Sequence, residues 1–580
     1  MEKIYETKYK DRNPFETVII IKNLLLNKNI LTTEKWLSDE IHNLYSVKVE
    51  IDNTNLFSNG KGTTKIYALA SAYGELIERL QNKAFFSINT KILHFDKIKY
   101  NDSNEDVIEY DEKKIENLII NWLSMFKKIE NNNSLIPKLK TLIKQNNNNI
   151  IRLQIFNNIE NEKTLILPYH LVNFYYGTNG MSAGNSKDEA LVQGISEILE
   201  RYVIKQVIIK KITPPLVSKD VLNNFPSVLN YIKEIEEKGP YKIELRDLSL
   251  GIGIPAIGLI LFNIDTMRYF VKIAVHPIID IAMERCFTEL LQGKKLKNYQ
   301  GMSDFTTSLK SVNLSENILD IFVNGEGLYP YEFFLSNSTY ECNIEKLAIK
   351  ENKDMYNYLI NIIKSLDFNI YINDTTNSPI YSYQVIIPGM SEIFNIDDEK
   401  ILIKNINFRK ICDYFMNLES LSKEQASEIL EYINTYYYDA TTNISTFLPR
   451  ISLNSNNVFN NTNINLFCCL LSLYLNDYKS ALSYLKQYLK IYPNCSIYYK
   501  CLLLYLTLTI EGYDNLVLTD LMDNFFDKKL VNKLLDDLNN YPLKAFKNLN
   551  CNNNCIGCNI TSKCKYNNEL NIYNIVRNNW

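Results

Sequence analysis

The sequence predicts an α+β fold: a mixed domain built on repeated helix–sheet units, an α-helical TPR-like (tetratricopeptide-like) domain, and a short Cys-rich tail. Three observations predict it. Strand and helix patterns alternate over the first two thirds of the 580 residues, strand patterns fade after about residue 400, and four cysteines cluster near the C-terminus. We therefore predict three parts, residues 1–400, 401–545 and 546–580.

The periods of the apolar residues predict the strands and helices of the first part. Residues 47–51 alternate apolar and polar side chains, and residues 257–262 form a continuous apolar run, as is typical of strands. Residues 68–80 and 189–203 carry apolar stripes of helical period. Residues 131–149 are polar, so we expect a loop there.

Residues 473–492 predict a helical hairpin in the second part. A helix ends in a short turn at Asn476 and Asp477, and a second helix stops before Pro493. This pattern is typical of one TPR-type unit, which cannot bury its own apolar face. Neighbouring helices at about 463–473, 498–510 and 519–538 should stack on it. The region is either a helical cap or a groove for a partner protein, because fold alone does not assign function.

Charge and hydropathy exclude two classes of protein. The net charge is −3, and no broad basic field exists to meet a phosphate backbone, so we expect no direct contact with nucleic acid. The first ten residues are polar, and the apolar run 18–26 is interrupted by Lys22 and too short to span a bilayer. We therefore expect a cytoplasmic protein without a membrane partner.

A repeated acidic helix carries the predicted chemistry. Residues 62–79 and 184–201 both run from glycine, six residues to alanine, seven to glutamate, three to a second glutamate, and then arginine. The two boxes are Glu75, Glu78 and Arg79, and Glu197, Glu200 and Arg201. Residues 282–289 repeat the alanine-to-glutamate spacing, with Arg285 four residues before Glu289.

These spacings have a physical meaning. Residues three or four apart share one side of a helix, so the acidic and basic side chains of each box project together. The first two copies follow glycine and small polar residues that suit a helix start, where Ser186 and Glu189 have capping-box spacing. Free backbone N–H groups at such a start favour a phosphate.

Carboxylates from three converging helices would suit Mg²⁺ rather than zinc, and the arginines and Lys61 would contact phosphate oxygens. One Glu-x-x-Glu-Arg box alone usually marks a solvated helix face. Two copies at identical spacing and a third partial copy favour a Mg²⁺-nucleotide site, in which positioning and charge neutralisation do most of the catalysis. His276, just before the third copy, is expected to be a structural residue rather than a base.

Five stretches, residues 58–65, 179–186, 275–277, 284–293 and 387–393, resemble the YcaO superfamily, and most of all its stand-alone bacterial branch. The likeness is strong over about the first 400 residues and loose over most of the rest. It implies a YcaO-type ATP-binding domain at 1–400, and an ATP-dependent enzyme, or its accessory, that hydrolyses ATP to activate backbone amides. The stand-alone branch is linked to β-methylthiolation of an aspartate in the twelfth small-subunit ribosomal protein. The implied partners are that ribosomal protein and a radical-SAM methylthiotransferase.

The resemblance also implies roles for individual residues. The Mg²⁺ ligands would be Glu75, Glu78, Glu197 and Glu200. The nucleotide would be lined by Lys10, Thr17, Ser71, Asn185, Glu189, Gln193, Arg201, Arg285 and Glu289. The implied catalytic residues are Glu78, Glu200, Arg201 and Arg285.

The chain end bears on the reaction. Peptide cyclodehydratases of this family end in a proline-rich motif, whereas this sequence ends Val576-Arg-Asn-Asn-Trp580, which disfavours azoline formation. Two alternatives stay open: ATP-dependent thioamide or azoline formation on a ribosomally made peptide, and a non-catalytic nucleotide-binding adaptor that docks partner proteins. A homodimer is one expected assembly.

The cysteine tail predicts a second metal site. Cys551, Cys555, Cys558 and Cys564 lie in a polar segment with few apolar residues. Four thiolates suit structural zinc or an iron–sulfur cluster, and four unliganded thiols are the plainer alternative. The first three have radical-SAM spacing, but no barrel follows them, so we reject that identity.

Overall fold

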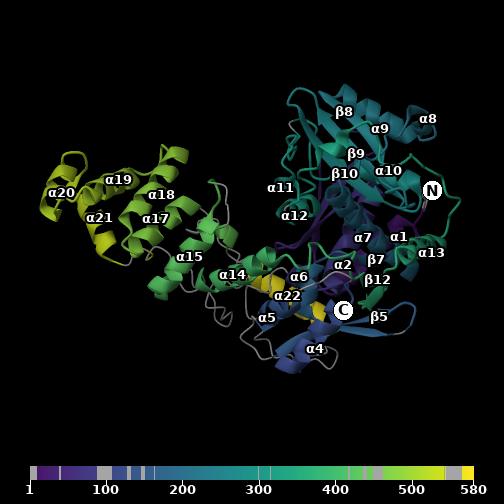
Figure 1. The fold of residues 1–580 in the computed structure, drawn as a ribbon, viewed down its shortest axis with the longest axis horizontal. Helices are drawn as coiled ribbons and strands as arrows, with labels where there is room; N and C mark the ends of the chain where they lie inside the picture. The colour runs from purple at the N-terminus through teal and green to yellow at the C-terminus, as the bar shows by residue number, and fades with distance from the viewer. Residues whose placement is uncertain are drawn as a thin grey trace. The chain divides into compact units, whose positions relative to one another are not determined.

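In the computed structural model, the chain folds into two compact units (Figure 1). The first comprises Met1–Ser87, Asn101–Ile401 and Asn568–Trp580, and the second comprises Ile88–Tyr100 and Leu402–Asn567. The described residues are 9–37, 41–87, 107–126, 132–144, 150–161, 163–297, 299–313, 315–415, 418–435, 440–447, 462–540, 543 and 565–579. The four cysteines of the tail lie outside them. Residues 568–580 group with the first unit, and the division into residues 1–400, 401–545 and 546–580 stays a prediction.

Three antiparallel sheets form the framework of the first unit. The first has the order β1 (Thr32–Trp36), β2 (Tyr45–Ile51), β3 (Phe57–Gly62). The second has the order β10 (Arg268–Val275), β9 (Ala256–Asn263), β8 (Tyr241–Asp247). The third has the order β4 (Val107–Glu109), β5 (Ile150–Asn158), β11 (Tyr371–Asp374), β12 (Tyr381–Ile386), β7 (Met181–Gly184), and β6 (Thr164–Pro168) also pairs with β5. The strands predicted at 47–51 and 257–262 are confirmed as β2 and β9.

Three helices connect these sheets: α2 (Lys65–Gln81), α7 (Lys187–Lys210) and α10 (Ile279–Leu290). Helix α2 packs on β2, β3 and β7; α7 packs on β7, β12 and β10; and α10 packs on β9, β10 and β3. Each helix therefore contacts two sheets, and each sheet is contacted by two of the helices. The acidic boxes lie on α2 and α7, and the partial third copy lies on α10.

Helices α2 and α7 start in the same way. Thr64 and Ser186 are their N-caps, and the Ser186 hydroxyl accepts a hydrogen bond from the Glu189 N–H at 3.1 Å. A Cβ on Gly62 would lie 2.6 Å from Ala68 N, and one on Gly184 would lie 2.5 Å from Ala190 N. The shared glycine-to-alanine spacing thus marks a strand that runs closely past the first turn of its own helix.

The remaining helices surround this framework. They are α1 (Pro14–Asn27), α3 (Ala84–Ser87), α4 (Glu112–Leu123), α5 (Asn132–Lys144), α6 (Tyr169–Tyr175), α8 (Lys219–Leu222), α9 (Pro226–Glu237), α11 (Leu309–Val312), α12 (Ser315–Asn324), the 3-10 helix η2 (Tyr331–Phe334) and α13 (Asn352–Ser365). The prediction of a loop at residues 131–149 is wrong for residues 132–144, which form helix α5. Leu135, Leu139, Leu142 and Ile143 are buried on one stripe of this helix, and their burial favours it despite the polar residues around them.

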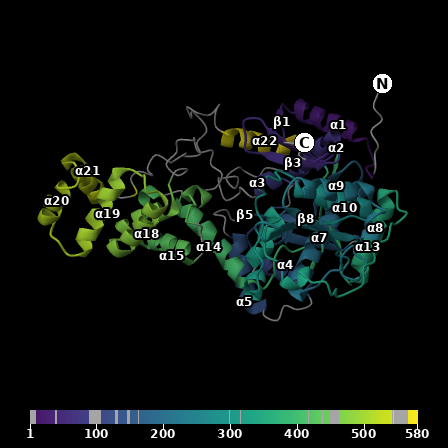
Figure 2. The ribbon, with the colours of Figure 1, turned by 90° about the horizontal axis from the view of Figure 1, so that it is seen from above.

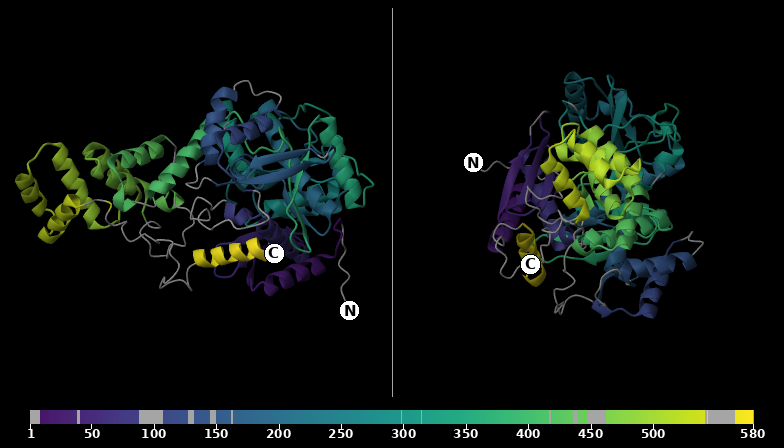
Figure 3. Two further views of the ribbon diagram at one scale, coloured as in Figure 1. Left: turned by 90° about the horizontal axis from the view of Figure 1, so that it is seen from below. Right: turned by 90° about the vertical axis from the view of Figure 1, so that its left-hand side faces the viewer.

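The C-terminal helix α22 (Lys565–Asn579) lies beside the first sheet (Figures 2 and 3). The Asn55 N–H donates to Glu569 Oε1 at 2.8 Å, and Asn568 Nδ2 donates to the Asn53 carbonyl at 3.0 Å. The ring of Tyr573 meets that of Phe86 edge-on, with centroids 5.0 Å apart. The end of the chain is therefore part of the first unit's packing.

The second unit is helical where it is described, and no strand occurs among the described residues after Ile386. Its helices are α14 (Glu399–Phe415), which begins at the boundary, α15 (Lys423–Thr435), α17 (Ile464–Tyr474), α18 (Tyr478–Ile491), α19 (Ile497–Ile510), α20 (Asn515–Asp523) and α21 (Lys528–Asn539), with 3-10 helices η3 (Leu418–Ser420) and η4 (Ile444–Phe447). The turn predicted at Asn476 and Asp477 joins α17 to α18. That this helical domain is TPR-like stays a prediction.

One helix boundary differs from the prediction. Residues 519–538 form parts of two helices, α20 and α21, instead of one. Asp527 caps α21 by accepting from the Lys529 N–H at 2.8 Å, and this new helix start interrupts the apolar period. No described helix is both long and apolar enough to cross a bilayer.

Candidate active site

A cavity of about 470 Å³ lies in the first unit, between α2, α7, α10 and residues 9–13, the N-terminal strap. Every residue predicted for the nucleotide and Mg²⁺ site lines it: Lys10, Thr17, Ser71, Glu75, Glu78, Asn185, Glu189, Gln193, Glu197, Glu200, Arg201, Arg285 and Glu289. The structure thus brings together side chains from four separate stretches of sequence, 10–17, 71–78, 185–201 and 285–289. Their individual roles stay predictions.

The two acidic boxes face the cavity with their arginines paired to their own glutamates. Arg79 lies 3.6 Å from Glu75 and 3.3 Å from Glu78, and Arg201 lies 2.9 Å from Glu197 (nitrogen to oxygen). Burial raises the pKa of Glu78 to about 8; Arg79 opposes this rise, and Glu197 and Glu75 add to it. The carboxyl groups of α2 and α7 therefore repel one another across the cavity.

The end of the cavity near α10 has the opposite character. Burial would raise the pKa of Glu289, but Lys61, Arg285 and Lys272 together hold it well below its usual range. Burial raises the pKa of Glu200, Glu289 raises it further, and Arg285 and Lys61 oppose the rise. A cluster of cations therefore lies next to a cluster of carboxyl groups.

This lining fits a magnesium–nucleotide pair. As many acidic as basic side chains line the cavity, seven of each. Within the part of the chain that the structure describes, no three acidic, histidine or cysteine side chains are close enough to hold a metal ion by themselves. Mg²⁺ in nucleotide sites is commonly held by carboxylates together with phosphate oxygens, which is the combination that this lining would provide with a bound nucleotide.

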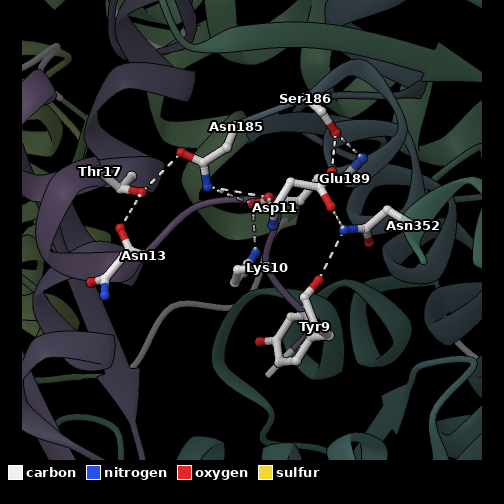
Figure 4. Close-up of polar contacts among 9 residues, drawn as sticks. All are labelled: Tyr9, Lys10, Asp11, Asn13, Thr17, Asn185, Ser186, Glu189 and Asn352. Carbon is white, nitrogen blue, oxygen red and sulfur yellow. Dashed lines mark hydrogen bonds and ion pairs between the residues drawn. The ribbon is translucent and has the colours of Figure 1, made fainter. Parts of the chain in front are cut away.

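The N-terminal strap closes one side of the cavity at Glu189 (Figure 4). Lys10 Nζ lies 3.1 Å from Glu189 Oε1, and the Asp11 N–H donates to Glu189 Oε2 at 2.9 Å. Asn185 Nδ2 also donates to this carboxylate at 3.1 Å, and the Thr17 hydroxyl donates to Asn185 Oδ1 at 2.8 Å. Burial would lower the pKa of Lys10, but Glu189 raises it above its ordinary value, so the lysine stays charged.

His276 is held as a neutral structural residue, as expected. It is buried, and its Nδ1 accepts from the Ile278 N–H at 3.1 Å. Burial, with Arg285 and Lys10 nearby, holds its pKa well below its ordinary value. A buried ring with a lowered pKa that already accepts a backbone hydrogen bond at Nδ1 fits a structural role better than a proton-transfer role.

Sequence reasoning missed some residues of the lining. Lys272 lies within the apolar run 269–275 of strand β10 and lines the cavity, and a lysine inside such a run was the available signal. Arg12 of the strap also lines the cavity. Gln292 Nε2 donates to the Asn59 carbonyl at 3.0 Å and ties the segment after α10 to β3. No period or motif distinguishes Arg12 or Gln292.

Comparison with known proteins identifies the family. The family model described as YcaO cyclodehydratase, ATP- and Mg²⁺-binding, matches residues 59–391. The chain belongs to the YcaO family. An uncharacterized protein of Haemophilus influenzae is 31% identical over 421 residues, which are 71% of this chain and 70% of the relative. The Escherichia coli ribosomal protein S12 methylthiotransferase accessory factor YcaO is 29% identical over 496 residues, 82% of each chain.

Two solved structures that the chain matches are more distant in sequence. A YcaO from Methanopyrus kandleri bound with AMPPCP and Mg²⁺ is 16% identical, with a TM-score of 0.41, and the match covers 68% of this chain and 96% of that one. A heterocyclase in complex with substrate and cofactor is 16% identical, with a TM-score of 0.43, and the match covers 67% of this chain. This chain spans only 54% of the heterocyclase.

Proposed function

We propose that the cavity binds Mg²⁺-ATP and that the protein uses ATP in the post-translational modification of another protein. The observation that carries the proposal is the convergence of α2, α7 and α10 on one cavity with balanced charge. Clustered carboxyl groups beside clustered lysine and arginine side chains match a divalent cation bound to phosphates. The description of the matching family model supports the same ligand.

The lining residues divide into two groups in this proposal. Glu75, Glu78, Glu197 and Glu200 would hold Mg²⁺, with phosphate oxygens completing its coordination. Arg201, Arg285 and Lys10 would turn from their present glutamate partners toward the phosphates, where guanidinium and ammonium groups neutralise charge. Ser71, Thr17, Asn185 and Gln193 would supply neutral hydrogen bonds.

The acceptor is inferred from the relatives. When bound, Mg²⁺-ATP would supply the phosphoryl group that activates a backbone amide oxygen, with ADP as the leaving group, as the resemblance to this family implies. The name of the E. coli relative supports a role as accessory factor to a methylthiotransferase of ribosomal protein S12. The modification that the family resemblance implies is β-methylthiolation of an aspartate in that protein. A radical-SAM methylthiotransferase would then be the partner that forms the carbon–sulfur bond.

Nucleotide use is tested by Mg²⁺-dependent ATP binding and hydrolysis. Glu78→Gln and Glu200→Gln keep the side-chain shape and remove the charge, so both are expected to reduce hydrolysis at least a hundredfold. Glu237→Gln is the matched control, because Glu237 is exposed on α9 and does not line the cavity. Wild-type hydrolysis rates in both cavity variants would show that the site is assigned wrongly.

The acceptor is tested separately by intact-mass measurement of ribosomal proteins from cells that lack the gene. Loss of one methylthio group from a single small-subunit protein is expected. Restoring the gene should return the mass, whereas the Glu78→Gln form should not. Unchanged ribosomal masses would refute this acceptor and leave the nucleotide site to be judged by the hydrolysis assay.

A further inference from the structure

Asn352 holds the N-terminal strap from outside the cavity. It is the first residue of α13, is only 4% exposed, and does not line the cavity. Its Nδ2 donates to the Tyr9 carbonyl and to Asp11 Oδ1, each at 2.9 Å (Figure 4). These two partners belong to the residues immediately before and after Lys10.

The direction of the Asn352 amide is set by its partners. A backbone carbonyl and a carboxylate can only accept hydrogen bonds, so both N–H groups of the amide must face them. The flipped amide would place Oδ1 against two acceptors. Asn352 can therefore hold both sides of Lys10 in only one orientation.

The strap is also bound by the N-terminal turn of α7. The Ser186 hydroxyl donates to the Asp11 carboxylate, and the Asp11 N–H donates to Glu189. The two oxygens of the Asp11 carboxylate thus connect Asn352 to the N-terminal turn of α7. With both neighbours of Lys10 fixed, the lysine side chain has one backbone position from which to reach the cavity.

We propose that Asn352 is a positioning residue for nucleotide binding, acting through Lys10. This inference rests on the proposed Mg²⁺-ATP site. A strap that is ordered before the ligand arrives loses little further conformational freedom on binding, which strengthens affinity. Without Asn352, ordering of residues 9–13 would oppose nucleotide binding.

The clamp itself is tested without nucleotide, by hydrogen exchange of the strap amides. Asn352→Ala is expected to speed exchange at the Asp11 N–H about tenfold or more, because the strap opens more often. Asn357→Ala is the matched control, since Asn357 is an exposed asparagine of the same helix. Unchanged protection of Asp11 in Asn352→Ala would overturn the proposal.

The link to nucleotide is tested by Mg²⁺-ATP affinity in a double-mutant cycle. Asn352→Ala is expected to weaken binding about tenfold in the wild-type background and to have no further effect in Lys10→Ala. Equal losses in both backgrounds would show general damage and overturn the positioning role. If Asn352→Ala does not fold, the isosteric Asn352→Asp, which places a carboxylate against Asp11, takes its place with a larger expected loss.

The two proposals fail in different ways. Absence of Mg²⁺-ATP binding by the wild-type protein would overturn the proposed function, and with it the link from Asn352 to the nucleotide. Normal binding by the wild type and by both Asn352 variants would overturn the positioning role alone.

Discussion

Lys61 Nζ lies 2.9 Å from Glu289 Oε1, so a strand and a helix that are far apart in the sequence share an ion pair inside the cavity. Lys61 is a quarter exposed, whereas the side chain of Glu289 is 8% exposed. Lys61 and Arg285 keep Glu289 ionised although it is buried, and the charge of Glu289 in turn raises the pKa of Glu200. Lys61 therefore affects two carboxyl groups whose pKa values are shifted in opposite directions, that of Glu289 downward and that of Glu200 upward.

Removing Lys61 is expected to destabilise the first unit. Lys61→Met leaves the buried Glu289 with less compensation, and the expected loss is roughly 1–3 kcal/mol of unfolding free energy. Denaturant unfolding of the single and double variants measures it. Glu289→Gln should recover most of the loss in the Lys61→Met background, and a loss of the same size in the double variant would contradict the pairing.

Stability without ligand should depend on pH through Glu78. Its folded pKa of about 8 lies above its ordinary value of 4.5, so the folded state binds the extra proton between these values. The stability contribution is fully present below about 4.5 and is lost as the pH rises through about 8. Thermal unfolding from pH 5 to 8 should show this fall in the wild type and a shallower fall in Glu78→Gln.

Binding of Mg²⁺-ATP should depend on pH in the opposite direction to the stability of the free protein. A cation at the carboxyl groups favours their ionised forms, so Mg²⁺-ATP binding should release protons and tighten as the pH rises from 6 to 8. Calorimetry in buffers of different ionisation enthalpy counts the protons. Proton release that is unchanged in Glu78→Gln would mean that Glu78 is not one of the groups that ionise.

Gly62 and Gly184, which lie where a strand runs past the first turn of the helix that follows it, should not tolerate an added methyl group. Gly184→Ala would press a Cβ against Ala190 N, and the expected destabilisation is roughly 1–3 kcal/mol. Gly74→Ala is the matched control, because its new methyl group inside α2 would have no atom within 4 Å, and it should stabilise by about 1 kcal/mol. Equal effects of the two substitutions would contradict the close approach.

The C-terminal helix should contribute to the stability of the first unit. Tyr573 is 3% exposed, and Tyr573→Ala is expected to cost roughly 3 kcal/mol and to increase hydrogen exchange along α22. Asn571→Ala, an exposed position of the same helix, should change neither. Exchange along α22 that is already fast in the wild type would refute its packing.

Sequence period and internal repetition predicted the central helices and the acidic boxes, whereas the resemblance to the YcaO family implied the other predicted residues that line the cavity. The two boxes were predictable because their spacing repeats, and the positions of Glu75, Glu78, Glu197 and Glu200 follow from helical geometry alone. Helix α5 was missed because four buried apolar residues are scattered among asparagines and lysines, so composition obscured the stripe.

Other parts of the site depend on contacts that no local pattern encodes. Asn352 meets Asp11 across 341 residues of sequence, and nothing around Asn352 indicates that partner. The break between α20 and α21 depends on whether Asp527 caps a new helix or continues the old one, and tertiary packing decides between them. The cysteine tail lies outside the described residues, so its zinc or iron–sulfur site stays a prediction.

The alternation of three helices with three sheets has a consequence for folding. The lining of the cavity comes from all three of these helices, α2, α7 and α10, so no fragment of the first unit that lacks one of them can carry the complete cavity. Nucleotide binding would then report completion of the whole unit, and at a hundred times its Kd a ligand would add about 2.7 kcal/mol to the unfolding free energy. Chains that stop short of α10 should gain none of this protection, which makes the ligand a selective stabiliser of fully folded molecules.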